Sequence, residues 1–459
     1  MEAGIKRLRP SKSFNRQGEI MIRQTVFGFK IEKTNEELTA HGGLALMAEY
    51  NHGIGLCGLV DQHLPGPGSN RGYQASAFVD SLVLMLQGGG RCLEDVRELR
   101  QEEPLLKLID RKEIPNPDTI GDWLRRMGDP QNNQAGLLGL GHVRDTTNHR
   151  ILRRDKAEDY TLDMDATQVE GEKADAQYTY KGEKGYMPLL GFLFEPAICL
   201  YDEFREGNES PAAGHTAFYR QCKARMPKGK RLARFRADSA SYQADLINEL
   251  EKDNVQWTIT ADQDVAVQAI IRNMAEDEWK EPRQGCGYEL AEAVHTMNKT
   301  KKSFRLIIKR ELRKLKDLFD VVEEKYHHYA VATNWPEEIK DAQAVLTWHN
   351  RRGQAENYNK ELKGGFGQDQ MPCGESYANA VYFRIGVIAY NLFIGIKRLS
   401  CLAAWAHHTV ATFRWKVIQV AGRIVRHAGK LVLKLAVGDD KLNLFQDIRR
   451  ECYEVSATT

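Results

Sequence analysis

A series of short alternating and apolar segments between residues 158 and 262 constrains the fold most strongly. DYTLDMDAT, MPLLGFLFE, AICLYDEFRE and RLARFRADSA follow one another, and the amphipathic SYQADLINELEKDN and the alternating VQWTITAD come next. A period of two is typical of half-buried strands, and short apolar runs between turns are typical of buried ones. The order predicts three antiparallel strands followed by a strand, a helix and a strand, which is a mixed α/β sheet.

This order matches the first part of a ribonuclease-H-like α/β fold. Residues 263–345 then interrupt the pattern, because YELAEAVHTM, SFRLIIKREL and HHYAVATNW all have strand character. From residue 346 the sequence has helical periodicity again. We therefore predict the first part of the core at 151–262, a β-rich insertion at 263–345 and the second part of the core at 346–400.

The flanking regions differ from this core. Residues 1–40 form a basic arm, 41–150 are helical, and 401–459 form a basic region that we expect to be helical with a strand-like end. In IPNPDTIGDWLRRMG, Asp118 or Thr119 could cap a short helix that carries Arg125 and Arg126. A helix-turn-helix-like DNA-binding module and a plain helical packing domain explain this stretch equally well.

Composition limits the functional classes. Lys and Arg number 65 and Asp and Glu 63, so any nucleic-acid-binding surface must be local rather than a property of the whole chain. The eight cysteines contain no CxxC pair, which favours reduced thiols in a cytosolic protein. AVYFRIGVIAYNLFIGIKRL comes closest to a membrane span but contains Arg384 and Asn391, so we predict a buried helix and no membrane partner.

Three acids stand where metal-dependent phosphoryl transfer would need them. Asp165 and Asp238 end two predicted strands, and Glu356 lies in a polar predicted helix. Two divalent metals bound by such carboxylates could activate a water and stabilise a leaving oxygen. Each acid taken singly is more simply a solvated or capping residue. Asp163 shares a strand face with Asp165, so facing alone does not choose between them, and the strand-end position favours Asp165.

The segment RRGQAENYNKELK adds basic residues around Glu356. Arg352, Glu356, Lys360 and Lys363 fall at helical spacing on one face, where the cations could hold phosphates beside a metal-binding acid. A salt-bridged surface helix is the alternative, because Glu356 and Lys360 form a favourable i,i+4 pair.

Four motifs in order, LDMDAT, YKGEKGYMPLL, RFRADS and RRGQAENYNKELK, resemble the DDE transposases of bacterial insertion sequences, in particular the IS-thirteen-eighty group. The family's helix signature is Tyr, two residues, Arg, three residues, Glu, six residues, Lys. Arg352, Glu356 and Lys363 match this spacing, whereas His349 occupies the Tyr position with Trp348 beside it. The similarity runs from about GGRCLEDVREL to AGRIVRHAGKLVLKL.

The resemblance implies a ribonuclease-H-like core with Asp165, Asp238 and Glu356 as the catalytic triad, holding two Mg²⁺ ions for which Mn²⁺ can substitute. It implies nicking at transposon ends and strand transfer by the 3′-hydroxyl in a cut-and-paste mechanism, with a hairpin intermediate. The residues expected to contact DNA there are Arg352, Lys363, His349, Trp348 and Lys360. An aromatic residue would stack on a displaced base, with Trp257, Trp335 and Trp348 as candidates and core packing as the alternative for each.

The expected partners are double-stranded DNA, as terminal inverted repeats and target, and a second copy of the chain on paired ends. We expect a bacterial cytoplasmic protein that is nucleoid-associated when bound to DNA. Further DNA contacts are assigned to the basic arm, to the 91–128 helices with Arg125 and Arg126, and to Arg414, Lys416, Arg423 and Arg426, with a solvated charged face as the alternative. A metal-dependent nuclease without strand transfer and a DNA-binding protein with a decayed core remain open.

Overall fold

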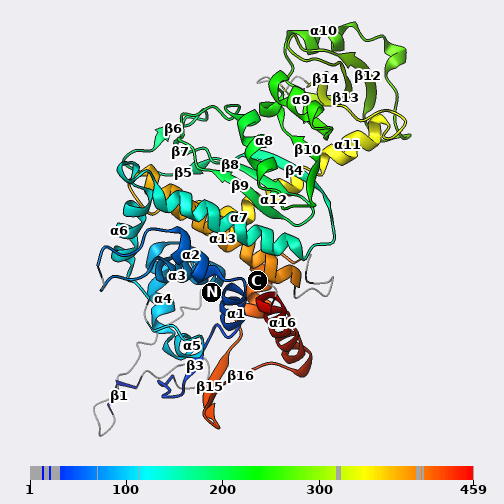
Figure 1. Cartoon of the computed structure of the whole chain (residues 1–459). Helices are drawn as coiled ribbons and strands as arrows, with labels where there is room; N and C mark the ends of the chain where they lie inside the picture. Colours follow the sequence, from blue (N-terminus) through cyan, green and yellow to red (C-terminus); the bar gives the residue numbers. More distant parts are fainter. Residues whose placement is uncertain are drawn as a thin grey trace, which may run out of the picture.

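The computed structural model describes residues 31–457, apart from 70, 113, 317–321, 400–404 and 406–407, and it also describes the short strands β1 (Ser13–Phe14) and β2 (Ile20–Met21). The basic side chains predicted to form the N-terminal arm lie outside the described residues. Figure 1 shows a helical part at the lower end, a central sheet, and a lobe that continues this sheet at the upper end.

An eight-stranded mixed sheet forms the centre, which confirms the predicted α/β class. The strand order is β12-β13-β14-β11-β10-β4-β8-β9. Its core comprises β4 (Asp159–Ala166), β8 (Leu189–Leu193), β9 (Ile198–Glu203), β10 (Arg231–Ala237) and β11 (Gln256–Thr260). β4, β8 and β9 are antiparallel neighbours, whereas β10 lies parallel to both β4 and β11. Helix α9 (Ala244–Lys252) connects β10 to β11, as the sequence pattern predicted.

The strands of segment 263–345 extend the core sheet. After helix α10 (Val265–Asn273), the chain forms β12 (Glu289–His295), β13 (Phe304–Lys316) and β14 (Val322–Thr333). β14 pairs antiparallel with β11, with Thr333 opposite Thr258. These strands therefore continue the central sheet beyond β11.

Two long helices lie across the sheet near β9: α7 (Ala135–Arg153) and α13 (Ser376–Leu399). Within the described residues, α13 is the one helix long and apolar enough to cross a membrane, and 94% of its apolar window is buried inside the protein. It packs on α3 (Ala75–Gly88), α6 (Pro117–Gly128), α7 and β9. The predicted buried helix is thus the central helix of the molecule.

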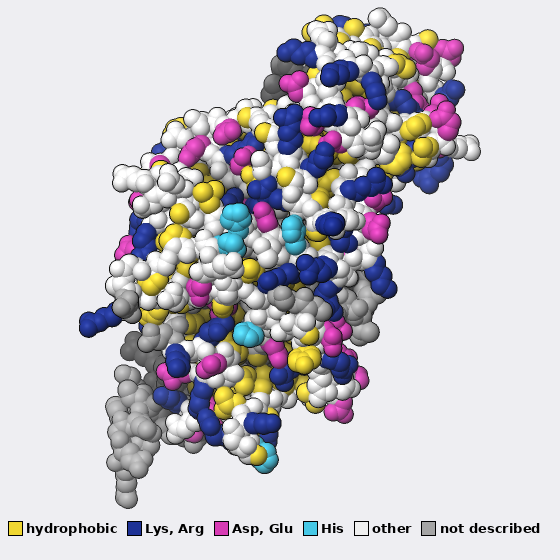
Figure 2. Space-filling model, in the orientation of Figure 1, with side chains coloured by type: hydrophobic (Ala, Val, Ile, Leu, Met, Phe, Trp, Pro, Cys, Tyr) yellow, Lys and Arg dark blue, Asp and Glu magenta, His cyan; other side chains and the backbone are white. Residues whose placement is uncertain are grey.

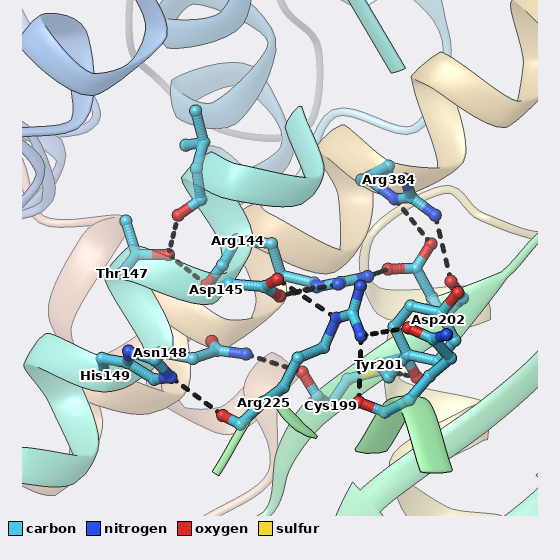
Figure 3. A network of polar contacts seen from close by, with 12 residues as sticks. Arg144, Asp145, Thr147, Asn148, His149, Cys199, Tyr201, Asp202, Arg225 and Arg384 are labelled. Carbon is cyan, nitrogen blue, oxygen red and sulfur yellow. Dashed lines mark hydrogen bonds and ion pairs between the residues drawn. The ribbon is translucent and has the colours of Figure 1, made fainter. Parts of the chain in front are cut away.

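A buried polar network joins these two helices to the sheet (Figure 3). Arg144 of α7 donates to Asp202 of β9 at 2.6 Å, and Arg384 of α13 donates to the same carboxylate at 3.0 Å. Burial by itself would raise the pKa of Asp202, but the two guanidinium groups hold it below its usual range. Asn391 of α13 adds hydrogen bonds to the backbone of Cys199. The network fixes the position of α7 and α13 on β9.

The lower part of the molecule combines both ends of the described chain. It contains α1 (Leu44–Gly53), α2 (Leu56–His63), α3, α4 (Val96–Gln101), α5 (Glu103–Leu108) and α6, together with α15 (Val410–Phe413), β15 (Gly422–His427), β16 (Lys430–Leu435) and α16 (Asp439–Ala457). β15 pairs with β3 (Leu38–Thr39), and α16 packs on α1. The expected helical C-terminal region therefore also contains a two-stranded ribbon.

One local prediction in this part was wrong. Helix α6 is capped by Asn116, whose side chain accepts a hydrogen bond from the Thr119 N–H at 2.8 Å, and not by Asp118 or Thr119. Helices α4 and α5 are separate, because Glu102 between them leaves the helical conformation ahead of Pro104.

Candidate active site

Asp165 and Asp238 lie side by side at the C-terminal ends of the neighbouring inner strands β4 and β10, a place that we call the acidic edge. β4 and β10 are parallel, and Ala237 is opposite Met164, so the next residue of each strand is an aspartate at the same level. The Asp238 side chain also accepts a hydrogen bond from the Ala240 N–H at 3.1 Å, which fixes it at the start of a short 3₁₀ turn. Strand pairing alone therefore brings together two acids that are 73 positions apart.

Helix α12 (Gly353–Gly365) packs on β4 and supplies the third acid, Glu356, in its first turn. One turn later, Asn359 donates a hydrogen bond to Asp165 at 2.8 Å. Burial raises the pKa of Asp165 to about 7, with the negative charges of Asp238 and Glu356 adding to the effect and Arg352 opposing it. The three acids thus share one electrostatic environment. Asn359 was missed in the sequence, although its i+3 position from Glu356 places it near the same face.

The donor set fits a hard divalent cation. All three candidate ligands are carboxylates, which Mg²⁺ prefers, and the charges of Asp238 and Glu356 add to the effect of burial in raising the pKa of Asp165. Glu356 is half-exposed and pairs with Arg352 at 3.6 Å. Among the described residues, no three His, Cys, Asp or Glu side chains are gathered closely enough to hold a metal as they stand. Glu356 would have to turn from Arg352 toward the aspartates to complete such a set.

Asp163, unlike Asp165, forms a buried ion pair with Arg236. Its two carboxylate oxygens accept hydrogen bonds from Arg236 at 2.7 and 2.8 Å, and both side chains are fully buried. Arg236 also donates to the backbone oxygen of Trp348 at 2.9 Å and lies over the rings of Phe194 and Trp348. The pair therefore joins β4, β10 and the helix that leads to α12, directly behind the acidic edge.

His349 does not lie where a phosphate could reach it. It belongs to α11 (Ala342–Asn350), is 1% exposed, and its ring nitrogens contact the hydroxyls of Thr258 and Thr260 at 2.8 and 3.1 Å. Burial lowers the pKa of His349 to about 3, and Arg352 and Arg236 add to the shift. The expected DNA contact of His349 is therefore corrected to a packing contact between α11 and β11.

The three tryptophans that are candidates to stack on a displaced base differ in solvent exposure. Trp257 is fully buried and donates its indole N–H to Glu251, so it cannot receive a displaced base as the structure stands. Trp348 and Trp335 are partly exposed and meet edge to face, with ring centroids 6.0 Å apart. Of the three candidates, only the latter two are accessible for stacking.

The basic residues of α12 are not equivalent. Arg352 is 19% exposed beside Glu356, whereas Lys360 points to solvent. Lys363 donates to the backbone oxygen of Gln168 and lies 3.5 Å from the hydroxyl of Thr167, in the loop that follows Asp165. Burial lowers the pKa of Lys363. Arg352 and Lys363 thus flank the acidic edge from opposite ends of the helix, and Lys360 does not.

The more distant basic candidates are divided between surface and interior. Arg125 is partly exposed and pairs with Asp122 and Glu375, each at 3.1 Å, while Arg126 is exposed at the end of α6. Arg414 is only 8% exposed and donates to the backbone oxygens of Leu86 and Gln87, and burial lowers its pKa to about 10. Arg414 is therefore a packing residue and its predicted DNA contact is corrected.

The raised pKa of Asp165 predicts a pH-dependent difference in stability. Its carboxyl titrates near 4 when unfolded and near 7 when folded, so the stability from its bound proton is full below pH 4 and is lost as pH rises to about 7. The Asp165→Asn variant has no titrating carboxyl at this position, so its stability does not fall in this way as pH rises. In EDTA, the melting temperature of the variant minus that of the wild type is expected to grow between pH 5 and pH 8. An unchanged difference across that range would contradict the shift.

Comparison with known proteins defines the family. Carboxylates gathered at the ends of neighbouring strands can hold the divalent metals that phosphoryl transfer uses. The model of the family described as Transposase DDE domain group 1 matches residues 26–452. The chain therefore belongs to this family of DNA-cleaving and DNA-transferring enzymes, and the predicted membership of the DDE transposases is confirmed.

The chain was also compared with solved structures and with curated proteins. A structurally similar solved chain is the piggyBac transposase, determined by cryo-EM in a synaptic complex with hairpin DNA. It has a TM-score of 0.41 and 10% sequence identity, and the match covers 92% of this chain and 81% of that one. The comparison with curated proteins finds no match.

Proposed function

We propose that the protein cuts DNA at the ends of its mobile element and joins the freed 3′-ends to target DNA by a cut-and-paste mechanism. The observation that supports this most directly is the pairing of Asp165 and Asp238 at adjacent strand ends, with Glu356 on the helix above them. Family membership supplies the reaction class, and these three residues supply the acids that the reaction needs.

Asp165, Asp238 and Glu356 would hold Mg²⁺, as two ions, with Mn²⁺ as a substitute. Bound there, the ions would supply Lewis acidity to the attacking and leaving oxygens. Asn359 holds the Asp165 carboxylate at 2.8 Å and so fixes its orientation at the acidic edge. The Arg236–Asp163 pair keeps the two strand ends and the start of α12 in a fixed relation.

Arg352 and Lys363 are proposed to hold the phosphates on either side of the cut. Arg352 lies beside Glu356, so its guanidinium would be released to DNA when Glu356 turns inward. Lys363 occupies a partly buried position beside the Asp165 loop, where an entering phosphate could replace the backbone oxygen of Gln168 as its partner. Trp348 or Trp335 would stack on a displaced base if the second strand is cut through a hairpin.

The DNA partners are terminal inverted repeats and target duplex, and two copies of the chain are proposed to act on paired ends. In such an arrangement, each copy would carry one complete acidic edge on its own sheet, because all three acids come from one chain.

A joining assay with pre-cut ends tests the reaction class. The wild-type protein with Mg²⁺ is expected to nick an end-containing duplex and to join a pre-cut 3′-end to a target plasmid, and EDTA should remove both activities. Denaturing gels give the nicked and hairpin products, and native gels give the joined product. Nicking without joining, on the same DNA and with active protein, would instead assign the chain as a nuclease on this core.

A further inference from the structure

The strands β15 and β16 form a narrow antiparallel ribbon that projects from the lower end of the molecule (Figure 1). The two strands are joined by Ala428 and Gly429, which both have positive φ, at 48° and 77°. Such two-residue turns match the twist of the flanking strands and keep a hairpin tight. The ribbon is therefore a defined structural element and not an irregular loop.

The two faces of the ribbon are chemically different. Residues directly opposite each other share a face. On the inner face, Ile424 pairs with Leu433 and is 2% exposed, and Leu435 packs against the main core. The outer face consists of three cross-strand pairs, which are Arg423 with Lys434, Val425 with Val432, and His427 with Lys430. The apolar face thus anchors the ribbon and leaves the basic face toward solvent.

The outer face carries positive charge that the described residues neutralise only in part. No acidic residue occurs between positions 422 and 437. Arg423 and Lys434 stand directly opposite each other, an arrangement that destabilises an isolated hairpin. Among the described residues, Glu36 pairs with Arg423 at 3.3 Å, and no carboxylate pairs with Lys430 or Lys434. Figure 2 shows dark blue, cyan and yellow side chains at this lower tip.

We propose that this outer face binds double-stranded DNA by lying in the major groove. The major groove admits a two-stranded β-ribbon, and the strands are only about 4.8 Å apart. Arg423, Lys430 and Lys434 would contact phosphates and base edges, while Val425 and Val432 between them would face thymine methyl groups. A polyanion would also relieve the repulsion between Arg423 and Lys434. The inference rests on the proposed function, because it assigns a surface to the DNA that the active site cuts.

The test uses three full-length double variants, two on the outer face and one control that loses the same two positive charges as Arg423→Gln with Lys434→Gln. Arg423→Gln with Lys434→Gln removes charge from the outer face, and His427→Gln with Lys430→Gln is a second variant of the same face. The control, Lys252→Gln with Arg450→Gln, removes one charge from the exposed end of α9 and one from exposed α16. Binding to a duplex of about three helical turns is measured by fluorescence anisotropy at several salt concentrations, with a single-stranded oligonucleotide as competitor.

The outer-face variants are expected to weaken duplex binding about 10-fold or more, and Arg423→Gln with Lys434→Gln should lower the salt slope by about 2, whereas the control should stay within about 2-fold of wild type. The control should also cleave with Mg²⁺ at the wild-type rate. Equal binding by outer-face and control variants would overturn the proposal, as would a single strand that competes as well as duplex. Failure of the wild type to cleave would refute the proposed reaction, while the binding comparison would still decide the role of the ribbon.

Discussion

Replacing Asp238 by Asn, or Glu356 by Gln, is expected to abolish cleavage of transposon-end DNA while the protein remains folded. Each change removes one anionic oxygen donor and keeps the side-chain shape. The loss in single-turnover rate should be on the order of 10³-fold or more, because the charge of the transition state is no longer matched. In Asp238→Asn, the new amide oxygen could still accept the hydrogen bond that the carboxylate takes from the Ala240 N–H, so the turn after β10 should persist.

The matched control is Asp245→Asn, which removes an exposed acid from the first turn of α9, beyond the turn that follows Asp238. It should leave the nicking rate unchanged. Nicking of a labelled duplex with Mg²⁺ gives the rate, and circular dichroism confirms the fold. Wild-type activity in Asp238→Asn or Glu356→Gln would show that the acids at this edge are not the catalytic ones.

The second large effect separates the two aspartates of β4. Asp165→Asn is expected to abolish cleavage without loss of stability, since it removes a buried charge near two other acids. Asp163→Asn is expected to destabilise the protein by about 3–5 kcal/mol, because it leaves the buried Arg236 without its counter-charge. Its cleavage should be weakened but not abolished at a temperature where the variant is folded. Urea unfolding and the nicking rate at low temperature measure the two effects separately.

Asp202→Asn provides the control for stability alone. Asp202 is another fully buried carboxylate, paired with two arginines, and it lies on β9, away from the acidic edge. This variant should lose comparable stability and keep the nicking rate of the folded fraction. If Asp163→Asn abolishes cleavage in folded protein as fully as Asp165→Asn does, then Asp163 is a ligand and its assignment to Arg236 is wrong.

Local sequence patterns predicted the elements of the core because each pattern depends on neighbouring residues. The period-two segments became β4 and β10, and their last residues came to lie together because parallel strands end at one edge. The Arg236–Asp163 pair could not be predicted in this way. It depends on the register between two strands that are about 70 residues apart, and no local periodicity encodes that register.

The role of His349 was predicted wrongly for a different reason. The family spacing implies one continuous helix from His349 to Lys363, on which shared faces can be counted. In the structure, α11 ends at Asn350 and α12 begins at Gly353, so the helical phase is broken between His349 and Glu356. Arg414 was misplaced for a related reason, because a basic stretch reveals charge but not which side chain the packing of neighbouring helices encloses.

The pairing of β3 with β15, and of α1 with α16, has a consequence for protein synthesis. Glu49 of α1 forms a bidentate ion pair with Arg449 of α16, and the N–H of Ile424 in β15 donates to the backbone oxygen of Glu37, beside β3. β3 and α1 are therefore synthesised well before β15 and α16, and this part of the molecule can close only once the later segments are present. A chain released before Gly422 would contain every strand of the catalytic sheet yet lack the strand that pairs with β3 and the helix α16 that packs on α1. Premature termination would therefore leave β3 unpaired and one side of α1 uncovered.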